Sequence, residues 1–196
     1  HISITSINFL LAVLCSVAIT FYFSGGSIKK TVITAVVGLL IISVSLFLCM
    51  HVYDWSWDGN AYRKARTGLL KYGWNPIYET YFDFAISNNM SFLKSAGIWY
   101  DTSPKASEII AAVFYAITNN VEAAKCYTFI SICSLFCISF AFLFETKMLK
   151  KWQCVLCSLT AVIYPASLAQ SLTYYNDVLL GFMLYLCFIA LLYLTF

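Results

Sequence analysis

The sequence predicts an all-α protein, a polytopic bundle of transmembrane helices with short amphipathic helices in one large external loop. Of its 196 residues, 61% are apolar and 11% are charged, whereas soluble domains are about 45–50% apolar and about 25% charged. The mean hydropathy is +0.80, and one core in a chain of this length cannot bury so much apolar surface. These observations argue against a soluble globular protein and favour an integral membrane protein.

Five apolar stretches approach the length of about 20 residues that a membrane span needs. Within a single transmembrane domain covering residues 1–196, we predict spans at about residues 2–23, 31–52, 121–144, 154–172 and 178–196. Pro165 is expected to kink the fourth span. Because the chain starts at His1 without a methionine and stops at Phe196 inside an apolar run, we expect it to be part of a longer protein.

Basic residues in the short loops predict the orientation of these spans. Lys29 and Lys30 follow the first span, and three lysines between residues 147 and 151 follow the third. Short loops rich in Lys and Arg face the cytoplasm, so the long segment 53–120 is expected on the external face. The net charge is +3, and no run of five like charges occurs, so nothing indicates nucleic-acid binding.

The external loop, residues 53–120, is rich in aromatic rings. It contains four of the five tryptophans, interleaved with charged residues. Disordered segments are poor in aromatic residues, and amphipathic rings prefer the headgroup level of a membrane. We therefore expect short helices lying on the outer membrane surface. One of them is expected over residues 108–117, which is too short to cross a bilayer.

Acidic and basic side chains gather where the second predicted span leaves the membrane. Asp54 and Asp58 are followed closely by Tyr62, Arg63 and Arg66. In a partly desolvated site, burial and neighbouring charges can make such a carboxylate a general base. An alternative is that Asp58 caps the helix that follows it. Residue spacing leaves both interpretations open.

Three short motifs occur in order along this region. Residues 58–63 read Asp-Gly-Asn-Ala-Tyr-Arg, residues 73–78 read Gly-Trp-Asn-Pro-Ile-Tyr, and residues 103–108 read Ser-Pro-Lys-Ala-Ser-Glu. Together they resemble the first external loop of GT-C glycosyltransferases, in particular bacterial multi-pass members related to the protein O-mannosyltransferase and aminoarabinose-transferase groups. The resemblance covers about residues 50–130, with weaker support from residues 176–181.

The resemblance implies an enzyme of the bacterial inner membrane whose active loop lies on the external face. Such enzymes take a sugar from a polyprenyl-phosphate carrier and pass it to an acceptor, usually with inversion. An aspartate in the first external loop is the catalytic base. By resemblance this residue is Asp58, with Asp54 as its alternative or partner.

The resemblance also implies cations that stabilise the phosphate as it leaves. We assign this role to Lys105, Arg63 and Arg66. Lys105 follows Pro104 and is expected in the first turn of a helix capped by Ser103, where backbone N–H groups favour a phosphate. The remaining candidates for the site are Tyr62, Asp177 and Glu108.

The chain departs from the family pattern at three places. Arg63 stands where similar proteins have His, and residues 102–103, Thr-Ser, stand where they have His-Tyr. Gly59 follows Asp58 where some members carry a second acidic residue, which weighs against a metal site because a hard divalent cation prefers several oxygen ligands. No cofactor is therefore assigned, although a divalent metal stays open, with Asp177 as a candidate ligand.

Two other functions remain as alternatives. A transporter or flippase would place ionisable side chains within the spans, whereas the charges concentrate in the external loop. The other alternative is a non-catalytic membrane scaffold. The lipid bilayer is the partner in each interpretation, and the sequence does not identify an acceptor for the sugar.

Overall fold

Every regular element that the structure describes is a helix. The computed structural model describes residues 6–91, 94–103 and 105–195, and no strand occurs among them. The all-α prediction is therefore confirmed. The helices are α1 (Ser6–Phe23), α2 (Ile28–His51), α3 (Lys64–Lys71), α4 (Tyr81–Ser87), α5 (Lys94–Thr102), α6 (Ala106–Thr118), α7 (Cys126–Glu145), α8 (Lys151–Val162), α9 (Pro165–Gln170) and α10 (Asp177–Thr195), with a π-helical turn η1 (Gly59–Arg63) and a short 3-10 turn η2 (Ala123–Lys125).

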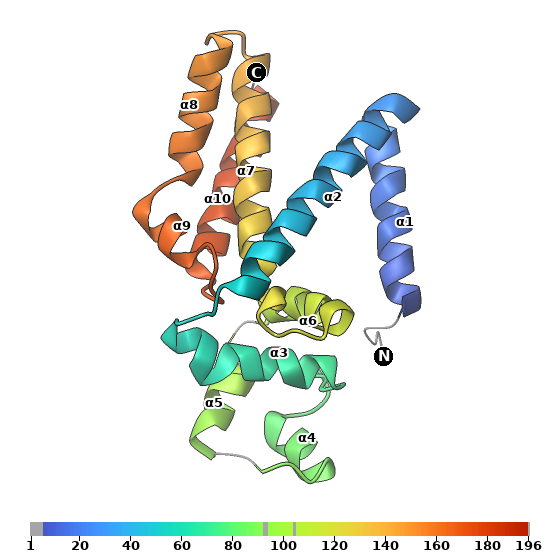
Figure 1. Cartoon of the computed structure of the whole chain (residues 1–196), viewed down its shortest axis with the longest axis vertical. Helices are drawn as coiled ribbons and strands as arrows, with labels where there is room; N and C mark the ends of the chain where they lie inside the picture. Colours follow the sequence, from blue (N-terminus) through green and yellow to red (C-terminus); the bar gives the residue numbers. More distant parts are fainter. Residues whose placement is uncertain (1–5, 92–93, 104, 196) are drawn as a thin grey trace.

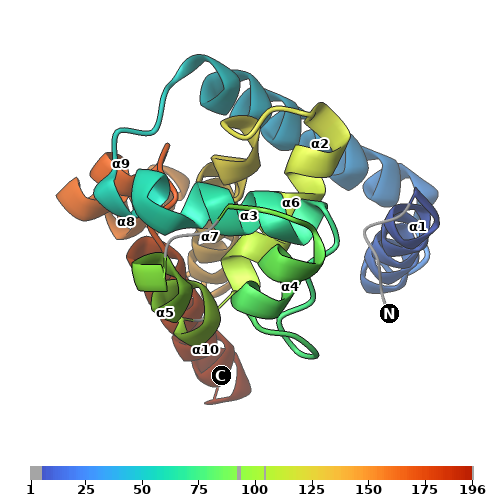
Figure 2. The same ribbon diagram turned by 90° about the horizontal axis from the view of Figure 1, so that it is seen from below.

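The helices form two regions. In the first, which we call the bundle, α7 packs against α2, α8 and α10, and α1 runs back along α2 as the other arm of a hairpin (Figure 1). In the second, the lower region, α3 and α6 pack together across the end of the bundle, with α4 and α5 beyond them. Figure 2 shows the lower region from below, with α3, α4 and α5 in front of the bundle.

Among the residues that the structure describes, two helices are long and apolar enough to cross a membrane. They cover Ile28–His51 and Ala123–Glu145, which match the predicted spans 31–52 and 121–144. The described apolar parts of α1 and α10, Leu10–Phe23 and Asp177–Tyr193, are shorter. The ends of the predicted spans at residues 2–5 and 196 lie outside the described residues. The multi-pass bundle therefore stays a prediction.

The predicted fourth span, residues 154–172, is two helices rather than one kinked helix. Helix α8 ends at Val162, and α9 begins at Pro165 after Tyr164, whose backbone is extended at φ −125° and ψ 159°. Proline has no N–H to donate, and its ring favours an extended residue before it. The predicted kink is wrong because Pro165 serves as the first residue of a new helix.

Each region has its own packed interior. In the lower region, aromatic rings of η1, α4 and α5 form a core around Trp74, which is 2% exposed. In the bundle, Leu135 of α7 meets Val162 of α8 and Phe182 of α10. The outer faces of the bundle remain apolar, since Leu39 of α2 is 64% exposed and Leu184 of α10 is 65% exposed.

Candidate functional site

The π-helical turn η1 sets the geometry of the first motif. Gly59 begins this turn, and a Cβ atom at that position would overlap the Asp54 carboxylate and the Ser56 hydroxyl. Only glycine leaves room for the backbone to pass this close to Asp54. Single π-helical turns are frequent at functional sites, and here the turn brings Tyr62 and Arg63 to the side of Asp58.

Asp58 does not cap a helix. Its backbone is already helical, at φ −58° and ψ −42°, and its side chain makes no capping hydrogen bond, whereas a capping residue is typically extended. Instead, Asp58 Oδ2 accepts a hydrogen bond from the Tyr62 hydroxyl at 2.8 Å. Arg63 Nη2 lies 3.5 Å from the same oxygen, and the Asp58 side chain is 23% exposed. The capping interpretation is wrong, and the carboxylate remains partly open.

Tyr62 lies between Asp58 and the two arginines. Its ring centroid is 5.3 Å from the guanidinium carbon of Arg63 and 5.1 Å from that of Arg66. Burial raises the pKa of Tyr62, and the hydrogen bond to Asp58 raises this pKa further. The phenol therefore stays protonated and donates its proton to the Asp58 carboxylate.

A buried carboxylate holds both arginines. Glu108 is 1% exposed, and its Oε1 accepts hydrogen bonds from Arg63 Nη1 at 3.1 Å and from Arg66 Nη2. Its Oε2 accepts from the Ser107 hydroxyl at 2.8 Å. Burial, the largest single effect, lowers the pKa of Arg63, but Glu108 and its other neighbours together raise this pKa above its ordinary value. Arg63 is therefore a fixed cation.

The other two predicted phosphate ligands bind backbone carbonyls. Arg66 is fully buried, and its Nη1 donates to Trp99 O at 3.3 Å and to both the carbonyl and the hydroxyl of Ser103. Lys105 Nζ donates to Asp101 O at 2.7 Å and to Ser103 O at 3.2 Å. These cations join the end of α5 to α3 and α6.

The expected cap of α6 is wrong. Helix α6 begins at Ala106, and Lys105 occupies the capping position without a side-chain cap. Ser103, the predicted cap, instead donates its hydroxyl proton to Trp99 O at 2.6 Å. Burial lowers the pKa of Lys105, and Arg66 lowers it further. Pro104 lies outside the described residues.

A cavity of about 430 Å³ lies beside Arg63, between α6 and α10. One part of its wall is polar and includes Arg63, Ser103 and Ser107, together with Asn176 and Asp177 at the start of α10. The remainder of the wall is mostly apolar and is formed by Ala106, Ile110, Leu179, Leu180 and Met183. We call it the amphipathic cavity.

The structure brings only part of the predicted site to the amphipathic cavity. Arg63 and Asp177 line it, and Asp58 adjoins it through its contact with Arg63. Arg66 and Lys105 are not among its lining residues. Asp177 is exposed, and its Oδ2 accepts a hydrogen bond from Gln170 Nε2 at 3.5 Å.

Asp54 holds two distant segments together instead of facing the amphipathic cavity. Its side chain is fully buried, and its oxygens accept hydrogen bonds from Ser56 N at 2.8 Å and from Tyr174 N at 3.0 Å. The second bond joins the loop after α2 to the segment before α10. Asp54 N also donates to Glu122 Oε2 at 3.1 Å.

Glu122 is the centre of a second charged cluster that sequence reasoning missed. Its Oε1 lies 2.5 Å from Lys64 Nζ, and its Oε2 pairs with the fully buried Lys125, which also donates to Val52 O. Burial raises the pKa of Glu122, but the hydrogen bonds from Lys125 and Lys64 lower it below its ordinary value. Lys125 follows three residues later along the chain, whereas Lys64 lies 58 residues away, so local spacing could indicate only one partner.

Within residues 6–91, 94–103 and 105–195, no three His, Cys, Asp or Glu side chains are grouped as metal ligands would be. No protein-family model matches the chain, and no characterised protein or solved structure matches it either.

Proposed function

We propose that this chain is a multi-pass membrane glycosyltransferase of the GT-C type. It moves a sugar from a polyprenyl-phosphate donor to an acceptor on the external face of a bacterial inner membrane. The observation that carries the proposal is the placement of Asp58, which contacts Arg63 at the polar end of an amphipathic cavity. A base and a fixed cation at such a cavity suit a substrate with an anionic head and an apolar tail.

The length of α10 and the exposed apolar side chains of α2 and α10 support insertion of the bundle into a membrane. Helix α10 has 19 residues, which is about 28 Å at 1.5 Å per residue and close to the hydrocarbon thickness of about 30 Å. Exposed leucines on the outer faces of α2 and α10 would be costly in water but suit lipid.

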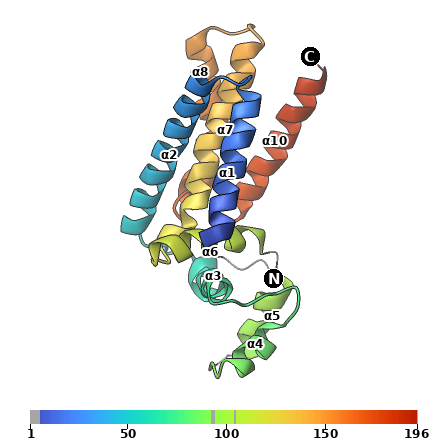
Figure 3. The same cartoon turned by 90° about the vertical axis from the view of Figure 1, so that its right-hand side faces the viewer.

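The arrangement of charges supports the predicted orientation. The α1–α2 turn and the α7–α8 loop, which carry the short-loop lysines, lie at the same end of the bundle (Figure 3). The lower region, with Asp58 and Arg63, lies at the opposite end. In this orientation the candidate site faces the external side.

The proposed reaction needs one base and one cation. Asp58 takes the proton from an acceptor hydroxyl or amine as the acceptor atom bonds to the anomeric carbon of the donor sugar. The bond from that carbon to the phosphate oxygen breaks, and the lipid phosphate leaves with the electron pair. Arg63 stabilises the charge that develops on this phosphate. Tyr62 orients Asp58, and Glu108 positions Arg63.

The contacts divide the three predicted cations into two roles. Arg63 lines the amphipathic cavity, whereas Arg66 and Lys105 are not among its lining residues. Arg66 and Lys105 donate to carbonyl groups at the end of α5. In this proposal Arg63 therefore binds the donor phosphate, whereas Arg66 and Lys105 support the wall of the cavity.

The test compares the lipids and glycans of a strain that lacks the full-length protein with those of complemented strains, by mass spectrometry. The strain that lacks the protein is expected to accumulate a lipid-linked sugar and to lose one glycosylated product. The full-length protein and its Asp83→Asn variant should restore the product, because Asp83 belongs with Thr80 to the capping box of α4 and does not line the amphipathic cavity. Asp58→Asn should not restore it, although it reaches the same level in the membrane.

Two results would contradict the proposal. Restoration of the product by Asp58→Asn would remove Asp58 as the base. Identical lipid and glycan profiles with and without the full-length protein would overturn sugar transfer and favour a transporter or scaffold.

A further inference from the structure

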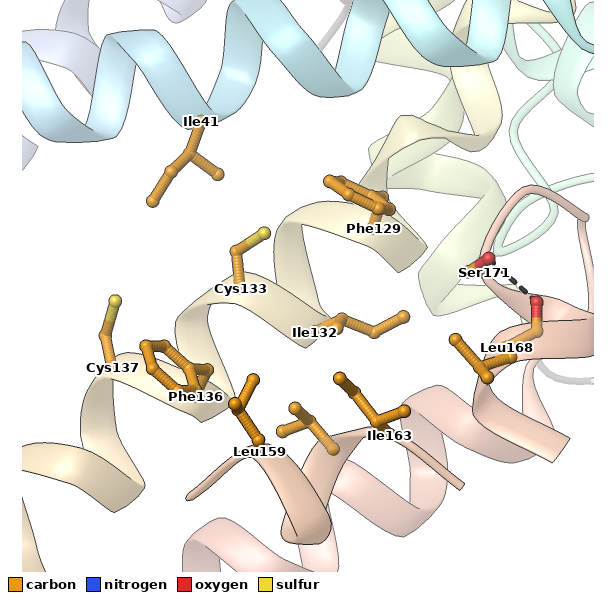
Figure 4. A pocket seen from close by; sticks show the side chains of 11 residues that line it. Ile41, Phe129, Ile132, Cys133, Phe136, Cys137, Leu159, Ile163, Leu168 and Ser171 are labelled. Atoms are coloured by element: carbon orange, nitrogen blue, oxygen red, sulfur yellow. Dashed lines mark hydrogen bonds between the residues drawn. The ribbon is translucent and has the colours of Figure 1, made fainter. Parts of the chain in front are cut away.

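A second cavity, of about 430 Å³, lies inside the bundle, away from Asp58 and Arg63. Its walls come from α2, α7, α8 and α9 and are almost entirely apolar (Figure 4). Ile41 of α2 points toward Cys133 of α7 across this space, and Phe136, Leu159 and Ile163 line its far side. We call it the bundle groove.

The bundle groove continues toward the lower region. A neighbouring cavity of about 400 Å³ shares Leu168 and Ser171 with it as lining residues, so the two cavities are adjacent there. The walls of the neighbouring cavity include Tyr53, Trp55 and Thr173. From the first cavity to the second, the walls therefore change from apolar near Ile41 to aromatic and polar where α2 ends.

The length of this space matches one leaflet of a bilayer. Ile41 lies near the middle of α2, eleven residues before Val52, which lines the neighbouring cavity. Eleven residues of helix rise about 16 Å at 1.5 Å per residue, and half of a hydrocarbon core of about 30 Å is about 15 Å. Aromatic residues such as Trp55 are typical of the headgroup level.

We propose that the bundle groove holds one acyl chain of a membrane phospholipid from the external leaflet, with its headgroup beside Trp55 and Thr173. The inference rests on the part of the proposed function that places α2 and α7 in the membrane. An apolar space of this size offers water almost no hydrogen-bond partners, so an acyl chain is the ligand that its walls favour. This lipid binds apart from the amphipathic cavity and takes no part in the proposed sugar transfer.

The test uses the full-length protein in dodecylmaltoside, with dioleoyl phosphatidylglycerol as the probe and native mass spectrometry as the readout. Wild-type protein is expected to retain one phospholipid after most of the lipid has been removed. Cys133→Phe places a ring in the groove and should lower this occupancy at least fivefold. Cys187→Phe is the matched control, because Cys187 lies on an exposed face of α10 and does not line the groove.

A second pair of variants consists of one that fills the groove from its α2 wall and one control on the same helix. Ile41→Trp should lower occupancy as Cys133→Phe does, whereas Leu39→Trp on the exposed face of the same helix should not. Added phospholipid should raise the melting temperature of wild-type protein and of both controls, because a ligand that binds the folded state stabilises it. The melting temperature of a folded groove-filled variant should not respond.

Retention of one phospholipid by all four variants would overturn the inference. So would displacement of the phospholipid by undecaprenyl phosphate, which would assign the groove to the donor chain. Carbonate extraction of wild-type membranes separates the two proposals. If the protein stays in the membrane and all variants bind lipid equally, only the groove inference fails. If carbonate releases the protein, the membrane part of the proposed function fails.

Discussion

The bundle and the lower region differ in which side chains they bury and which they expose. The bundle packs leucine, valine and phenylalanine inside and exposes the same residue types outside. The lower region packs aromatic rings inside, and most of its charged side chains are half-buried. Buried charged residues occur in two places: Arg66 and Glu108 pair within the lower region, whereas Asp54 and Lys125 bind backbone groups near the ends of α2 and α10. The difference teaches that apolar packing builds each region, whereas a charged pair between Lys64 of α3 and Glu122, just ahead of α7, links the two.

The largest expected effect comes from removing the carboxylate that pairs with two arginines. Glu108→Gln removes the carboxylate that pairs with buried Arg66 and leaves Arg63 with Asp58 as its acidic partner, and breaking a buried pair in this way costs about 3–5 kcal/mol. Thermal unfolding in detergent should show a large fall in melting temperature. Glu79→Gln, whose carboxylate accepts one bond from Asn75 N, should change stability little. Equal melting temperatures would mean that the Glu108 pairs do not hold α6 to η1 and α3.

A smaller loss of stability is expected when a side chain is placed against the Asp54 carboxylate, which follows α2. Gly59→Ala would push a methyl group into Asp54 and Ser56, and overpacking of this kind costs about 1–3 kcal/mol. Gly68→Ala is the matched control, because a Cβ atom there meets nothing within 4 Å. In mid-helix that control should be neutral or stabilising by up to about 1 kcal/mol. A stable Gly59→Ala variant would contradict the close approach of Asp54.

Acid should lower the stability of the protein by protonating Glu122, which pairs with Lys64 and Lys125. The folded-state pKa of Glu122 lies below its ordinary value, which is about 4.3 in an unfolded chain. Its stabilising contribution is therefore full above about pH 5 and is lost as the pH falls through about 4 toward the folded-state pKa. Melting temperatures measured from pH 7 to pH 3 should fall more steeply for wild-type protein than for Glu122→Gln. Parallel curves would show that the ion pairs of Glu122 contribute nothing measurable to the stability of the protein.

The smallest expected effect concerns the bundle alone. Pro165→Ala should leave α8 and α9 separate, because the Ser167 hydroxyl still accepts a hydrogen bond from Tyr164 N. The variant should lose about 0.4–1 kcal/mol, chiefly through greater freedom of the unfolded chain. Circular dichroism should show no gain of helix. A clear gain would indicate one continuous helix, as the sequence prediction assumed.

Local patterns were enough to predict several elements of the fold. Apolar periodicity over residues 108–117 predicted α6, which covers Ala106–Thr118. The apolar stretch 31–52 predicted α2, which ends at His51. The same reasoning took residues 154–172 as one span, because apolar composition continues across Pro165 although the helix does not.

The candidate site was predicted less well than the fold. Nearness in sequence placed Asp58 beside Arg63, and the structure shows that contact. The same nearness suggested that Arg66 would share the role of Arg63, and both do bind Glu108. Arg66, however, is fully buried and also donates to the Trp99 and Ser103 carbonyls, whereas Arg63 lines the amphipathic cavity. Lys105 was assigned to a helix start, but its side chain reaches back to the carbonyl end of α5.

The sequence by itself determined the helical class, the concentration of charge between residues 53 and 120, and the short contacts around Asp58. These features depend on composition and on neighbours within a few residues, which the order of the chain specifies directly. The tertiary structure alone decided that Glu108 holds Arg63, 45 residues away, and that Asp54 meets Tyr174, 120 residues away. Such pairs form only when packed helices bring distant backbone segments together and burial makes an unpaired charge costly.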